Sequence, residues 1–145
     1  MSELRLHNFI PYRLSVAANA VSRRISESYR RRFGLKIAEW RVIAILAEHD
    51  RMTPQDIGNK GELDKITVSR AATALIDRGL LLQKRNPEDG RSHFLQLTPD
   101  GRALYEAIAP AALRLEQELL SRFSKEDRAQ LQSLLRRIEE AANSP

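Results

Sequence analysis

The sequence predicts a mainly α-helical protein with six helices and one small β-hairpin. Along most of the chain, apolar residues recur at steps of three and four, which is the period of an amphipathic helix. Near the middle, two short segments with helix-capping residues are joined by a tight turn. Two runs that favour strands follow them. With 145 residues, of which 42% are hydrophobic, the chain can bury a core without disulfides, and it has no Cys.

The first helix is expected from about residue 11 to 33, because Pro11 suits a first helical turn and Gly34 suits a helix end. The apolar stripe of this helix consists of Leu14, Ala18, Val21, Ile25 and Tyr29. A second helix is expected over about 37–49. Its inward residues are Trp40, Ile43, Ala44 and Ala47.

Two short helices are expected next. Thr53 caps the first of them, which ends near Gly61. Asp64 caps the second, which covers 65–78 and stops before a glycine. Two short helices joined by a tight turn form a helix-turn-helix, and in that motif the second helix is the one that contacts bases.

A β-hairpin is expected directly after this second helix. The runs 80–85 and 92–98 have strand-like patterns, and the residues from Asn86 to Arg91 between them favour a turn. A hairpin in this position is a wing with a charged tip. Residues 37–98 are therefore expected to form a winged helix-turn-helix DNA-binding domain.

The last two helices begin at Thr98-Pro99 and at Ser124, which are capping signatures. Their apolar stripes consist of Leu104, Ile108, Ala112, Leu115 and Leu119 and of Leu131, Leu134, Leu135 and Ile138. A small winged domain cannot cover all these residues, whereas a two-fold interface can. Segments 1–36 and 99–145 are therefore expected to form a helical dimerisation region.

The helix at 65–78 has two distinct faces at 100° per residue. The side that must face the core carries Val68, Ala71, Ala72 and Leu75. The opposite side carries Ile66, Ser69, Arg70 and Thr73, with Lys65 and Thr67 on its flanks. An Arg can pair with guanine, hydroxyls can reach base edges, and an apolar side chain can touch a thymine methyl group. This face therefore predicts insertion into a major groove.

The wing at 80–98 is expected to lie at the minor groove. Arg85 precedes the turn and Arg91 closes it, and a β-ribbon can place such an Arg in a narrow, electronegative groove. Asp89 either orients the Arg91 guanidinium or simply marks the turn, and both roles can hold together. Ser92 completes the expected DNA contacts. A net charge of +5 is consistent with a polyanionic partner.

Several of these motifs together resemble the MarR (multiple antibiotic resistance regulator) family. The resemblance is densest over 53–101, and it rests on the stretches 63–70, 79–80, Asp89-Gly90-Arg91 and 97–101, with Arg85 and Pro87. It implies a triangular homodimer that binds a pseudo-palindromic operator on double-stranded DNA. It also implies a transcriptional regulator, most often a repressor, that a small ligand such as an aromatic acid or a related anion releases.

The ligand pocket of such proteins lies between the dimerisation region and the winged domain. The candidate contacts near that crevice are Arg13, Asn19, Trp40, Arg41 and Tyr105. An Arg beside an aromatic ring would suit an aromatic carboxylate. For Trp40 the alternative is a core position, and for Arg41 it is a surface charge.

Other functions fit the sequence less well. One alternative is a winged-helix protein-interaction module that does not bind DNA. No phosphate loop, nucleophile pair or metal-ligand cluster indicates an enzyme, a catalytic residue or a cofactor, and His7, His49 and His93 are scattered. No apolar run is long enough to span a membrane, and no signal peptide is apparent, so a cytoplasmic protein is expected.

Overall fold

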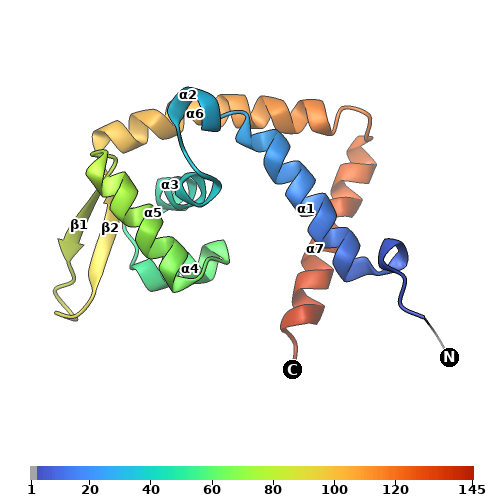
Figure 1. Ribbon diagram of the computed structural model, residues 1–145, viewed down its shortest axis with the longest axis horizontal. Helices are drawn as coiled ribbons and strands as arrows, with labels where there is room; N and C mark the ends of the chain where they lie inside the picture. The colour runs from blue at the N-terminus through green and yellow to red at the C-terminus, as the bar shows by residue number, and fades with distance from the viewer. Residues whose placement is uncertain (1–2) are drawn as a thin grey trace.

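The computed structural model describes residues 3–145, so the first two residues of the expected 1–36 segment lie outside the described residues. The elements in chain order are η1 (Leu6–Asn8), α1 (Ile10–Ser26), α2 (Arg30–Phe33), α3 (Ile37–Glu48), α4 (Pro54–Gly61), α5 (Lys65–Asp77), β1 (Leu81–Arg85), β2 (His93–Leu97), α6 (Pro99–Leu119) and α7 (Lys125–Asn143). The mainly helical class with one hairpin is therefore confirmed. Figure 1 shows a compact winged part joined through α6 to an arm that carries α1 and α7.

The described residues contain seven α-helices rather than six, because the first predicted helix is broken at its end. The hydroxyl of Ser26 donates to the Arg23 carbonyl at 2.7 Å, and that of Ser28 donates to the Ile25 carbonyl at 2.6 Å. Such bonds compete with the helical ladder. Tyr29 then leaves the helical conformation, with φ −141° and ψ −17°. Its side chain is 2% exposed, so burial of this ring accompanies the break.

The core lies in the winged part, where α3, α5, the hairpin and the start of α6 meet. Its most deeply buried side chains are Leu35, Val42, Ile43, Leu46, Ile57, Val68, Leu75 and Ile108. On α3, the predicted inward set is confirmed for Ile43, which is buried, and for Trp40 and Ala47, which are half-buried and pack against this core. Ala44 is only half-buried. The helix packs against α4, α5, α6 and β2, so Val42 and Leu46 are buried as well.

The helix-turn-helix is built from the predicted caps. Thr53 Oγ1 accepts the Asp56 N–H at 3.1 Å at the start of α4, and Asp64 Oδ1 accepts the Thr67 N–H at 2.7 Å at the start of α5. The turn between the helices is close, because a Cβ on Gly58 would lie 2.9 Å from the Leu63 carbonyl oxygen. Glycine allows that approach and so sets the angle at which α5 leaves the turn.

The hairpin pairs β1 with β2 in an antiparallel register in which Leu81 faces Leu97 and Gln83 faces Leu95. Met52 adds an isolated bridge to the other edge of β2, with bonds of 3.1 and 2.8 Å between its backbone and that of Leu95. Because the bridge involves one residue on each side, the sequence around Met52 has no alternation of apolar and polar residues that would predict a strand. It fixes the base of the wing to the segment before α4.

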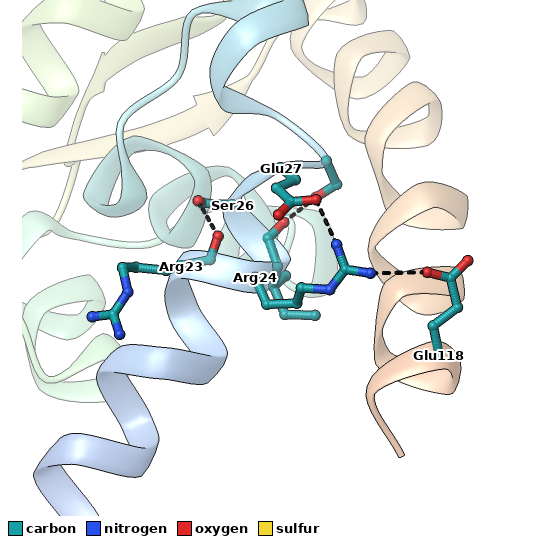
Figure 2. Close-up of polar contacts among 7 residues, drawn as sticks. Arg23, Arg24, Ser26, Glu27 and Glu118 are labelled. Atoms are coloured by element: carbon teal, nitrogen blue, oxygen red, sulfur yellow. Dashed lines mark hydrogen bonds and ion pairs between the residues drawn. The ribbon is translucent and has the colours of Figure 1, made fainter. Parts of the chain in front are cut away.

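The arm extends from the winged part along α6, which passes through Pro110 without interruption. Figure 2 shows Arg24 of α1 between two carboxylates, at 2.6 Å from Glu27 and 3.2 Å from Glu118 of α6. These side chains are half exposed, so they orient the two helices more than they stabilise them. No residue of α7 is buried, and no helix within 3–145 is long and apolar enough to cross a membrane.

Candidate nucleic-acid interface and neighbouring cavity

The α5 helix has the two faces that the sequence predicts. Val68, Ala71, Ala72 and Leu75 are its buried residues. On the other side, Lys65, Ile66, Ser69, Arg70 and Thr73 are exposed, and Thr67 is half-buried. We call these six outward residues the recognition face. Its DNA contacts stay a prediction.

The recognition face presents both charge and apolar surface to solvent. Ile66 is 63% exposed, so most of its side chain is available to a partner. Arg70 is in no ion pair within residues 3–145, so its guanidinium keeps its donors free. The backbone N–H of Thr67 bonded to Asp64 holds the pKa of that carboxyl below its usual value, so the cap stays ionised.

The tip of the wing is held by side chains of its own turn. Asp89 Oδ1 accepts the backbone N–H of Arg91 at 3.0 Å, and the Asn86 amide donates to the Ser92 hydroxyl at 2.9 Å. Among the described ion pairs none joins Asp89 to the Arg91 guanidinium, so the turn role of Asp89 is the one that these contacts support. Ser92 is half-buried by the same contacts.

Arg85 and Arg91 are both exposed on the wing. Arg51 is a further cation beside the wing, and the sequence did not indicate it. Its guanidinium lies 4.5 Å from the ring centre of Phe94 on β2. Figure 1 shows the hairpin tip and the N-terminal part of α5 along the same edge of the winged part. With this arrangement, α5 and the hairpin can contact the same partner molecule at the same time.

A cavity of about 640 Å³ lies between α1, α3 and the end of α4. The side chains and backbone that line it belong to Val21, Ser22, Ile25, Tyr29, Ile37, Trp40, Arg41, Ala44, Ile45, Glu48, Lys60, Gly61 and Glu62. Two of the five predicted ligand contacts, Trp40 and Arg41, are in this lining. The residues from α4 were missed, since nothing in the sequence brings the end of that helix to α1.

The other three candidates lie outside the lining. Tyr105 stacks on Trp40 at 5.8 Å between ring centres, while Tyr29 stacks on Trp40 at 5.6 Å, so Tyr105 supports the aromatic wall without facing the space. Arg13 donates to the His7 carbonyl at 3.1 Å near the start of α1. Asn19 is exposed on the same helix.

Besides the charged residues Glu48, Lys60 and Glu62, the lining presents a phenol and a guanidinium. Burial raises the pKa of the Tyr29 phenol, and the positive charges of Arg41 and Arg30 oppose that rise only in part. The phenol is therefore a neutral hydrogen-bond donor at pH 7. Arg41 forms no ion pair within residues 3–145 and donates to the Gly61 carbonyl at 3.1 Å. An aromatic wall beside a guanidinium that has no carboxylate partner can hold a flat anion.

Comparison with known proteins finds one protein family. A family model described as the MarR family matches residues 33–92. The uncharacterized HTH-type transcriptional regulator YwoH of Bacillus subtilis is 29% identical over 125 residues, which cover 86% of this chain and 90% of YwoH.

Solved structures of the same kind match nearly the whole chain. A MarR/EmrR family transcriptional regulator from Acinetobacter sp. ADP1 is 27% identical, with a TM-score of 0.87 and coverage of 97% of this chain and 99% of that one. Bordetella bronchiseptica BpsR, whose DNA binding is regulated by 6-hydroxynicotinic acid, has a TM-score of 0.86 at 23% identity, covering 99% and 100%. At that identity, BpsR supports the fold alone.

Proposed function

We propose, from the premise that this chain is a winged-helix transcriptional regulator of the MarR family, that it binds a pseudo-palindromic site on double-stranded DNA as a homodimer. In each half-site α5 lies in a major groove and the wing, residues 80–98, lies at the adjacent minor groove. The observation that carries the proposal is the recognition face, which keeps polar, basic and apolar side chains free of the core.

The second copy is the partner that covers the arm. Exposed large apolar side chains gather on its helices, including Leu14 and Val21 on α1 and Leu113 on α6. On α7, Leu131, Leu134, Leu135 and Ile138 are 39–48% exposed along one stripe. Exposed apolar stripes on neighbouring helices are typical of obligate two-fold interfaces, which are more hydrophobic than transient ones. Residues 1–36 and 99–145 would form this dimerisation region, and 37–98 the DNA-binding domain.

The cavity supports control by a small molecule. It adjoins α1 of the arm and the end of α4 of the helix-turn-helix, so a ligand there touches both parts. We infer an aromatic acid or a related anion, because the wall supplies stacked rings and Arg41 supplies a charge. The regulator would act as a repressor whose DNA binding this ligand weakens.

Fluorescence anisotropy with duplex DNA from beside the protein's own gene tests the DNA-binding mode. Arg70→Ala should weaken binding by about 1–3 kcal/mol, which is the usual loss for an Arg that pairs with guanine. The matched control is Arg31→Ala, which removes the same charge from exposed α2, away from the edge that carries the wing tip in Figure 1.

Three results would count against this proposal. Equal loss in both variants would mean that only overall charge matters. Unchanged affinity for Arg70→Ala would remove α5 from the groove. If the unaltered protein binds no duplex even at low salt, a protein-interaction module is the better description. Light scattering of the eluted protein checks the dimer, and a monomer would contradict it.

A further inference from the structure

Arg41 belongs both to the cavity and to the helix-turn-helix. Its side chain lines the cavity from α3, and its Nη1 donates to the Gly61 carbonyl at 3.1 Å. Gly61 is the last residue of α4. The guanidinium therefore ties the helix that carries the cavity wall to the turn that leads into α5.

The turn at Gly61 has little freedom to absorb a change. A Cβ on Gly61 would lie 2.9 Å from Cδ1 of Ile45 and 3.4 Å from Cδ of Arg41, so the backbone is already close to both side chains. Glu62 adopts a left-handed conformation, with φ 53° and ψ 47°, and the Leu63 N–H donates to the Gly58 carbonyl at 2.9 Å. Because the cap of α5 follows at once, a shift of the Gly61 carbonyl reaches the recognition face.

The Arg41 guanidinium can exchange this partner for another. It has five N–H donors, of which the described contacts use one, and the acceptor is a neutral carbonyl. A carboxylate accepts a stronger, charge-assisted bond and can take two parallel donors at once. An anion that stacks on the Tyr29 and Trp40 wall would place its charge inside the cavity that Arg41 and Gly61 both line, where it competes with the Gly61 carbonyl for the guanidinium.

We propose that Arg41 is the positioning residue that couples the cavity to α5: a bound aromatic carboxylate draws the guanidinium away from the Gly61 carbonyl, which loosens the turn and misaligns the recognition face. This inference rests on the proposed function, because it assigns the path by which an effector would weaken DNA binding. A ligand can act in this way only if it binds the loosened state more tightly, and the freed guanidinium supplies that difference.

The first test needs no ligand. Arg41→Met keeps an unbranched apolar stem and removes the guanidinium donors, while Lys60→Met removes the other cation of the lining as a matched control. We expect Arg41→Met to bind DNA about tenfold more weakly, as for the loss of one hydrogen bond from a charged group. Amide hydrogen exchange at Leu63 and Thr67 should become faster in free Arg41→Met, and exchange in the wing should not.

The second test uses 6-hydroxynicotinic acid as the probe at millimolar concentration. In the unaltered protein it should weaken DNA binding and speed exchange at Leu63 and Thr67, as Arg41→Met does. In Arg41→Met it should have no further effect on either, whereas Lys60→Met should still respond. A residue that merely supported the fold would leave the response to the probe intact.

Several outcomes would overturn the coupling. The first is an amide exchange rate at Leu63 and Thr67 that is the same in Arg41→Met as in the unaltered protein. The second is a response to 6-hydroxynicotinic acid that is as large in Arg41→Met as in the unaltered protein. The third is that the unaltered protein does not respond to this probe. The exchange measurements need no DNA, so a protein that binds no duplex yet shows the expected exchange would refute the proposed function and leave the coupling standing.

Discussion

Neighbouring substitutions on the two faces of α5 should separate stability from DNA binding. Val68 is 1% exposed and Ile66 is 63% exposed, although both are β-branched residues in the first turn of the same helix. Val68→Ala removes two buried methyl groups, which costs about 1.6 kcal/mol in transfer free energy and about 2–3 kcal/mol with the cavity left behind. The melting temperature should fall by roughly 5–10 °C.

Ile66→Ala should have the opposite profile. Its free energy of unfolding should change by no more than about 0.5 kcal/mol, as is usual at exposed sites. If DNA covers the 63% of this side chain that is exposed, and full burial is worth about 1.5–3 kcal/mol, the loss of binding free energy is about 1–2 kcal/mol per half-site. Affinity should therefore fall at least fivefold.

Thermal unfolding by circular dichroism and anisotropy titration of each purified variant give the two quantities. Val68→Ala should retain its DNA affinity at a temperature well below its melting point. A reversed pattern, in which Ile66→Ala destabilises the fold and Val68→Ala weakens binding, would refute the assignment of the two faces. Equal binding by all three proteins would refute the groove contact at Ile66.

Further predictions concern the wing, the cap of α5 and the start of α6. Arg91→Ala should lower the slope of log K against log salt by about one unit, and an unchanged slope would remove the wing tip from the DNA backbone. Because the pKa of Asp64 is lower in the folded than in the unfolded protein, its ionised carboxylate stabilises the fold at pH values above the unfolded pKa of about 3.9. This contribution is lost as the pH falls through the folded pKa. The melting temperatures of the unaltered protein and of Asp64→Asn should therefore converge as the pH falls below about 4. A constant gap down to pH 2 would contradict the cap. Gly101→Ala should unfold at a much lower temperature, because its Cβ would lie 2.1 Å from the Leu80 carbonyl oxygen, and normal melting would show that this contact relaxes.

The sequence predicted α5 well because its two faces follow a single helical period. Val68 and Leu75 are buried, and Ser69 and Arg70 are exposed, as an angle of 100° per residue requires. The caps at Thr53 and Asp64 were predictable for the same reason, since a capping bond is local. Local rules of this kind identified the winged helix-turn-helix before any contact was known.

Long-range packing accounts for what the sequence could not predict. The break at Tyr29 accompanies the packing of its ring on Trp40 of α3, and Val42 is buried because α3 is covered on more than one side. The cavity joins residues from three helices, so Lys60 and Gly61 gave no signal of their own. The proposed coupling likewise depends on a contact between residues 20 positions apart, Arg41 and Gly61.

Intermolecular nuclear Overhauser effects in a complex with operator DNA test the central claim most directly. The account predicts contacts from the methyl groups of Ile66 to protons on base edges in the major groove, and none from the methyl groups of Val68. Contacts from Val68, or the absence of any contact from residues 65–73 while the protein stays bound, would contradict it.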